Sequence, residues 1–149
     1  MIALDATDRT ILRELQRDGR MSYAALGEAV GLSAPAARQR VQRLTEAKVL
    51  QVVGITDPLV LGWPAMAMLG VRTSGDPRAV ADALGELTEV IYVVLTAGSF
   101  QLFAEVVCAS TGDLLNLVED RVRTVDGVSG VETFPYFALH THRFTWDIP

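Results

Sequence analysis

The chain has 149 residues and a mass of 16.1 kDa, which is enough for one large domain or two small ones. Half of its residues are hydrophobic and 21% are charged, a composition that excludes a disordered chain. The single cysteine excludes an internal disulfide and a cysteine zinc site. Asp5 and Asp8 interrupt the basic and then apolar pattern of a secretory leader. The longest apolar run, residues 58–71, is shorter than the roughly 20 residues that span a bilayer. We therefore expect a cytoplasmic protein without a membrane segment.

The net charge of −5 is unevenly distributed. Residues 1–50 carry eight basic and six acidic groups, whereas residues 51–149 carry five basic and twelve acidic groups. Local potential, and not total charge, governs contact with phosphates. A basic N-terminal segment on an acidic body therefore still permits nucleic-acid binding.

Three short helices are expected in residues 1–50. Apolar residues recur at helical spacing after Asp5, which can cap the first helix. Ser22 can cap a second helix, and Ser33 can cap a third, whose first turn tolerates Pro35. Only residues 31–33 separate the last two helices, which predicts a helix-turn-helix.

The outward side of the third helix is rich in hydrogen-bond donors, and its first turn is slim. Arginine pairs with guanine, glutamine pairs with adenine, and either side chain can grip a phosphate. A slim helix end can approach base edges in the major groove of double-stranded DNA. The alternative is an arginine-rich face that is merely solvated. The candidate DNA-binding residues are Ser33, Pro35, Arg38, Gln39, Arg40, Gln42 and Arg43.

Residues 49–55 are apolar and β-branched, which predicts a short strand before a linker. Beyond it, the pattern predicts a strand, a helix, two strands, a helix and a last strand. This β-α-β-β-α-β order is the ferredoxin-like arrangement. The predicted strands are residues 65–71, 90–97, 102–109 and 128–144. The first predicted helix follows Asp76-Pro77, and the second spans residues 111–125.

Helices can cover only one face of such a sheet, yet residues 90–95 place apolar side chains on both faces. An uncovered apolar face of this size usually marks an interface. We therefore expect at least a homodimer, with the two sheets face to face.

Three segments carry a resemblance to the Lrp/AsnC family of regulators: LDATDRTIL at residues 4–12, LGEAVGLS at 26–33 and RVQRL at 40–44. The resemblance implies an α+β fold, with an N-terminal winged helix-turn-helix domain followed by a ferredoxin-like effector-binding (RAM) domain. The implied boundaries are residues 1–50 for the DNA-binding domain, 51–63 for a strand and linker, and 64–149 for the effector-binding and oligomerisation domain.

The family resemblance further implies a transcriptional regulator that binds a pseudo-palindromic operator and responds to a small effector such as an amino acid. Dimers of the family can assemble to octamers, with the effector between dimers near the middle turn of the sheet. Carried onto this chain, the effector residues are Thr96, Gly98, Ser99, Phe100, Gln101, Asp113, Thr133 and Phe134. The alternative is that the turn is only a tight hairpin packed at an oligomer interface.

Three single residues depart from the family pattern, and one of them is Thr45, which stands where the family has a glutamate after the leucine of the third helix. Gln101 stands where the family usually has an aspartate, so a neutral amide replaces a carboxylate that could pair with an ammonium group. Lys48 stands where a glycine commonly ends the third helix, so a residue with a side chain must close that turn.

Two other classes of protein remain open. Sirohaem decarboxylases share this two-domain plan, and an architectural protein could wrap DNA without an effector. Neither a nucleophile with its base nor a cofactor motif is found in the sequence, so we expect no enzyme and no cofactor. His140 and His142 could share a strand face, but no third ligand stands near them, so we expect no metal site.

Overall fold

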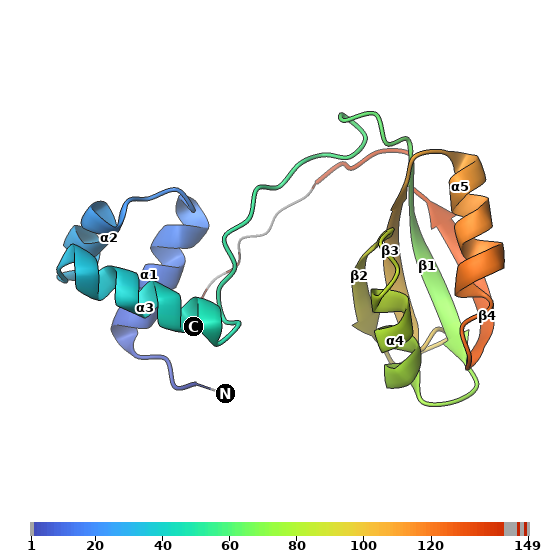
Figure 1. The fold of residues 1–149 in the computed structure, drawn as a ribbon, viewed down its shortest axis with the longest axis horizontal. Coiled ribbons are helices and arrows are strands. Elements are labelled where there is room, and N and C mark those ends of the chain that lie inside the picture. The colour runs from blue at the N-terminus through green and yellow to red at the C-terminus, as the bar shows by residue number, and fades with distance from the viewer. Residues whose placement is uncertain (1, 142–145, 147, 149) are drawn as a thin grey trace. The chain divides into compact units, whose positions relative to one another are not determined.

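The computed structural model describes residues 2–141, Trp146 and Ile148 (Figure 1). The chain divides into two compact units, which are Met1–Ile55 with Thr141–Pro149, and Thr56–His140. Ile148 packs against the core of the first unit. The end of the chain therefore belongs with the helical unit, whereas the sequence-based boundaries assign residues 64–149 to the second domain.

The first unit is a bundle of three short helices whose caps are those expected from the sequence. The side chains of Asp5, Ser22 and Ser33 each accept a hydrogen bond from a backbone N–H in the first turn. Ile11, Leu26 and Leu44 are fully buried between the helices. The helices are α1 (Ala6–Arg17), α2 (Tyr23–Val30) and α3 (Ala34–Glu46).

Residues in left-handed backbone conformation end α2 and α3. Gly31 ends α2 with a φ of 71°. After α3, Lys48 has a φ of 57°, the N–H of Val49 donates to the Leu44 carbonyl at 2.9 Å, and the N–H of Lys48 donates to the Thr45 carbonyl at 3.0 Å. This pair of hydrogen bonds is a Schellman motif, in which glycine is the usual residue. Lys48 therefore closes the turn in glycine's place, as the sequence requires.

The predicted strand over residues 49–55 is wrong. No strand is assigned between α3 and residue 65 among the described residues, and the side chains of Val52, Val53 and Ile55 are exposed. A strand needs a neighbour to take its backbone hydrogen bonds, and among the described residues no strand pairs with that segment. Among its described residues, the helix-turn-helix unit therefore shows no wing strand.

The second unit has the predicted β-α-β-β-α-β order, and its four strands form an antiparallel sheet in the order β2-β3-β1-β4. The second helix differs from the prediction, because α-helical turns give way to a π-helix, η1, over its second half. The last strand ends at Pro135 and not at residue 144, and residues 142–144 of the prediction lie outside the described residues. The elements are β1 (Ala65–Thr73), α4 (Pro77–Gly85), β2 (Val90–Leu95), β3 (Leu102–Cys108), α5 (Thr111–Asn116), η1 (Leu117–Val122) and β4 (Val128–Pro135).

Both helices of the second unit pack on the same face of the sheet (Figure 1). Alternate residues of β1 and β3, such as Leu69 and Ala104, are fully buried beneath Leu84 and Val122 of the helices. No helix of the unit covers the opposite face, which we call the open face. Within the residues that the structure describes, no helix has the length and apolarity needed to cross a membrane.

Candidate nucleic-acid interface and ligand site

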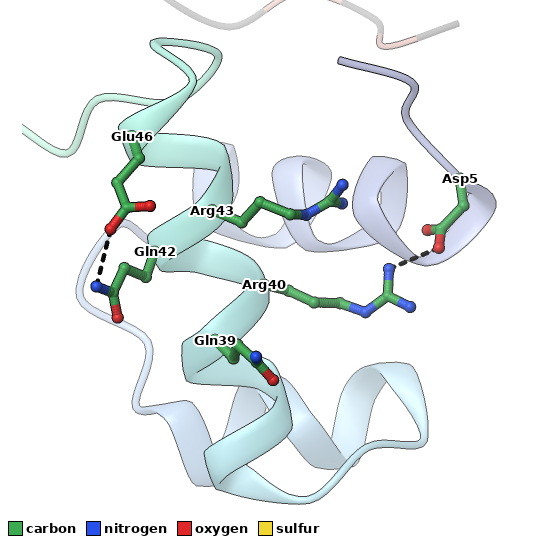
Figure 2. Close-up of a pocket in the computed structure, with 6 residues that line it drawn as sticks. All are labelled: Asp5, Gln39, Arg40, Gln42, Arg43 and Glu46. Atoms are coloured by element: carbon green, nitrogen blue, oxygen red, sulfur yellow. Dashed lines mark hydrogen bonds and ion pairs between the residues drawn. The ribbon is translucent and has the colours of Figure 1, made fainter.

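The donor-rich residues of α3 point in different directions, as Figure 2 shows. Ala37, Val41 and Leu44 form the buried stripe of the helix. Arg40 and Arg43 extend to one side, and Gln42 extends to the other, where its Nε2 donates to Glu46 Oε1 at 2.9 Å. Successive residues of a helix turn by about 100°, so side chains that stand close together in the sequence point to different sides of α3.

The side of Arg40 and Arg43 faces two carboxylates of α1. Asp8 is only 1% exposed, and its carboxylate accepts from Arg40 Nη1 at 2.9 Å and from Arg43 Nη2 at 2.5 Å. Arg40 Nη1 also donates to Asp5 Oδ2 at 2.6 Å. Within the first unit, these ion pairs join the N-terminal end of α1 to the middle of α3.

The same contacts lower the pKa of both carboxyls. Burial by itself raises the pKa of Asp8, but hydrogen bonds from Arg43, the Asp5 backbone N–H and Arg40 outweigh burial and bring it below the usual value. For Asp5, the hydrogen bond from Arg40 is the main cause of a lowered pKa. Asp8 is therefore a charged group in the interior, held ionised by its partners.

Arg38 differs from the other two arginines of α3. It is exposed, and among the described residues no carboxylate forms an ion pair with it. Gln39 and Gln42 are exposed as well. They line an open groove of about 580 Å³ together with Asp5, Arg40, Arg43 and Glu46 (Figure 2). Ser33 and Pro35 lie at the start of α3, where the Ser33 hydroxyl accepts from the N–H of Ala36 at 3.4 Å.

Sequence reasoning missed the role of Asp8. The residue stands three positions after Asp5, and each of the two side chains accepts from the backbone N–H of the other, which forms a capping box. That spacing was a detectable signal for the cap. The ion pairs with Arg40 and Arg43 carried no signal, because they join residues 32 and 35 positions apart.

The turn between β2 and β3 gathers five of the candidate effector residues, which are Thr96, Gly98, Ser99, Phe100 and Gln101. The Thr96 hydroxyl donates to the Phe100 carbonyl at 2.7 Å. Gln101 Nε2 donates to the Gly98 carbonyl at 3.3 Å, and its Oε1 accepts from the N–H of Thr73 at 3.0 Å. The amide of Gln101 therefore fastens the turn to the end of β1.

Phe100 lies on the open face and connects the turn to two more aromatic rings. Its centroid is 5.4 Å from that of Phe103 and 6.0 Å from that of Phe134, both in edge-to-face geometry. The guanidinium of Arg72 lies 4.7 Å from the Phe100 centroid and pairs with Glu132 at 3.3 Å. The sequence grouped Phe134 with this turn but gave no sign of Arg72.

Asp113 and Thr133 lie apart from the turn within one chain. Asp113 stands beyond the opposite end of β3, where its carboxylate accepts from the Ser110 hydroxyl at 2.6 Å in the first turn of α5. Thr133 pairs in register with Leu69, whose side chain faces the helices, so Thr133 lies on the covered face. A single chain therefore does not bring these two residues to the other candidates.

Metal ligands do not cluster within the described part of the chain, where no group of three or more His, Cys, Asp or Glu side chains could hold an ion. His142 lies outside the described residues. Cys108 is buried, and burial, followed by the charges of Glu89 and Asp113, raises the pKa of its thiol. A raised pKa disfavours the reactive thiolate.

The two units match two family models. The AsnC-type helix-turn-helix domain matches residues 4–45. The Lrp/AsnC ligand binding domain matches residues 66–143. Among similar proteins, the HTH-type transcriptional regulator FL11 of Pyrococcus horikoshii is 27% identical over 150 residues, which cover 99% of this chain and 97% of that protein. The regulatory protein AsnC of Escherichia coli is 29% identical over 136 residues, which cover 87% and 88%.

Solved structures agree with this assignment. The leucine response regulatory protein LrpA of Mycobacterium tuberculosis has a TM-score of 0.88 and 26% identity, covering 97% of this chain and 100% of that one. A transcriptional regulator of Neisseria meningitidis, solved as a complex with L-Met, shares the fold with a TM-score of 0.78 and 22% identity, covering 99% and 97%. The helix-turn-helix unit, the sheet unit and both family matches lead to one conclusion: the chain belongs to the Lrp/AsnC family of transcriptional regulators.

Proposed function

We propose that this regulator reads double-stranded DNA through the exposed face of α3. The observation that carries the proposal is that Arg38, Gln39 and Gln42 are exposed donors outside the buried stripe of α3. Ser33 and Pro35 complete the reading set at the slim start of the helix. We assign Arg40 and Arg43, which the sequence grouped with these residues, to the ion pairs that hold α3 against α1.

The protein acts as a homodimer whose open sheet faces pack together. The aromatic rings of Phe100, Phe103 and Phe134 form a patch on that face, and Tyr92 adds a half-exposed ring on β2. A two-fold dimer presents two copies of α3, which fits a pseudo-palindromic operator. Further assembly of dimers to an octamer is part of the same proposal.

The effector is an amino acid or a related metabolite that binds at the turn between β2 and β3. Because Gln101 is neutral and its amide already bonds to Thr73 and Gly98, an ion pair at position 101 does not select the effector. Thr96, Ser99 and the glycine backbone supply neutral hydrogen bonds instead. Asp113 and Thr133 enter this site only if another copy of the chain brings them there.

Two measurements test this function. A thermal-shift screen against amino acids and related metabolites reveals the effector, because a ligand of the folded state raises the unfolding midpoint. A gel-shift assay at fixed salt tests the DNA face, and we expect Arg38→Ala to weaken operator binding at least about fivefold. Unchanged binding in Arg38→Ala would remove α3 from the proposal.

The purified protein used in these assays also distinguishes the regulator from the other two functions. A regulator without a catalytic step purifies colourless and shifts DNA upstream of its own gene, whereas a sirohaem decarboxylase would retain a coloured tetrapyrrole. An architectural protein would show strong, length-dependent DNA binding and no hit in the thermal-shift screen. Regulation is favoured because the relatives matched over nearly the full chain are named transcriptional regulators.

A further inference from the structure

Asp8 is the single charged residue that is buried within the described part of the chain. Its two carboxylate oxygens accept from two different arginines of α3, Arg40 on Oδ1 and Arg43 on Oδ2. The backbone N–H of Asp5 donates to Oδ2 as well, at 3.1 Å. One carboxylate of α1 therefore holds two of the three arginines of α3.

These contacts change the charge that α3 offers to DNA. Asp5, Asp8, Arg40 and Arg43 together carry no net charge, so their field at a distance is weak. Arg38 is the arginine of α3 that has no carboxylate partner among the described residues. Contacts with phosphates supply most of the sequence-independent part of DNA affinity.

We infer that Asp8 is a specificity-determining positioning residue, which engages one Nη of Arg40 and one of Arg43, weakens the contacts of these guanidiniums with phosphates and fixes α3 for base reading. The inference rests on the proposed role of α3. Binding to random DNA becomes weaker because two guanidiniums are engaged within the protein. Binding to the operator is retained because the same ion pairs fix the direction of Arg38, Gln39 and Gln42. The ratio of the two affinities, which decides occupancy in a genome, increases.

Asp8→Asn tests this inference directly. An amide is neutral, keeps one of the two acceptor oxygens, and carries an NH2 group that can only donate, so the variant loses both ion pairs and holds the two guanidiniums more weakly. On a random-sequence duplex, we expect the slope of log K against log salt to steepen by about 1. The ratio of the affinity at 50 mM salt to the affinity at 200 mM salt should then grow about fourfold. Against the tightest duplex that the wild type selects from a random pool, we expect discrimination to fall about tenfold.

Asp5→Asn is the matched control, because it makes the same change in charge at a side chain that is 54% exposed. Asparagine still caps α1, and Asp8 keeps both arginines. We expect a smaller change in slope and little loss of discrimination. Equal effects of the two variants would show that net charge alone is responsible and would overturn the inference. Equal losses of specific and non-specific affinity in Asp8→Asn, with an unchanged slope, would also overturn it, because they would reduce Asp8 to a structural role.

A second pair of variants keeps the test valid if Asp8→Asn does not fold. Arg38→Gln and Arg43→Gln each remove one positive charge from α3, and Asp8 retains Arg40 in both. Fluorescence anisotropy on a random-sequence duplex should give a slope shallower by about 1 for Arg38→Gln and nearly unchanged for Arg43→Gln. Equal shallowing in both variants overturns the inference about Asp8. An unchanged slope in both contradicts instead the proposed DNA-reading face.

Discussion

Gly27 of α2 lies directly against the carbonyl of Leu32 in the turn before α3. A Cβ at position 27 would lie 2.6 Å from that oxygen and 3.2 Å from the Ser33 carbonyl carbon. The same two residues share a hydrogen bond, from the N–H of Leu32 to the Gly27 carbonyl at 2.8 Å. The close packing of α2 on the turn therefore requires a residue without a side chain.

Gly27→Ala should destabilise the helical unit by about 1–3 kcal/mol, because backbone and not a flexible side chain occupies the space. Urea unfolding followed by far-UV circular dichroism measures this effect. Gly54→Ala is the control in the same unit, since nothing lies within 4 Å of a Cβ there. Equal stability of the two variants would contradict the close packing.

Gly70→Ala should weaken the proposed dimer. A Cβ at position 70 would lie 2.9 Å from ring carbons of Phe100, so the ring must move away from Phe103 and Phe134. Because this aromatic patch forms the proposed interface, we expect the dissociation constant of the dimer to rise about tenfold, or 1.4 kcal/mol. Sedimentation equilibrium measures it, with Gly75→Ala as the control in open space. A dimer unaffected by Gly70→Ala would place the interface elsewhere.

Lys48→Gly should stabilise the helical unit by about 0.5–1 kcal/mol. Lys48 has a φ of 57°, a left-handed conformation that costs a residue with a Cβ more than it costs glycine. Lys48→Ala keeps the Cβ and removes only the charge, so this control should give no gain. Thermal unfolding of the three proteins separates backbone strain from the favourable charge at the helix end.

Acid should remove part of the stability of the helical unit through Asp8. The pKa of Asp8 is lowered in the folded protein, so its stabilisation is fully present above the unfolded-state pKa of about 3.9 and is lost as the pH falls through the folded-state pKa. Asp8→Asn should cost about 2 kcal/mol at pH 7, since the arginines are 31% and 46% exposed and the ion pairs are partly screened.

Urea unfolding at pH 7, 4 and 3 measures this dependence. The difference between the wild type and Asp8→Asn should shrink as the pH falls, because protonation removes the same charge as the substitution. Glu28→Gln is the control, since Glu28 is exposed in the same unit. A difference that stays constant from pH 7 to pH 3 would contradict the role of the Asp8 carboxylate.

Cys108 should resist thiol reagents in the folded protein. The side chain is 1% exposed, and burial raises the pKa of the thiol, so little thiolate forms and little of it is reachable. Labelling with a disulfide reagent at pH 8 should be about 100-fold slower than labelling in urea. Comparable rates in the two solvents would mean that the strand end opens readily.

The sequence by itself determined the local structure of this protein. Ser22, Ser33 and Asp76 cap helices as their positions predict, because a cap needs only a polar side chain next to its own helix. The alternation of buried residues in β3 follows from the two-residue period of a strand. The fold class and the order of the elements in the second unit follow from the same short-range patterns.

The tertiary structure decided which polar side chains are free to contact DNA or an effector and which are engaged within the chain. Arg40 and Arg43 resemble Arg38 in the sequence, and only the packing of α3 on α1 places them against Asp8. Residues 49–55 have the composition of a strand, but a strand forms only where another backbone accepts its hydrogen bonds. Sequence patterns also could not show that the Gln101 amide is engaged, because its Oε1 accepts from the N–H of Thr73 in β1. Contacts between residues distant in the chain depend on three-dimensional packing, and no local pattern records them.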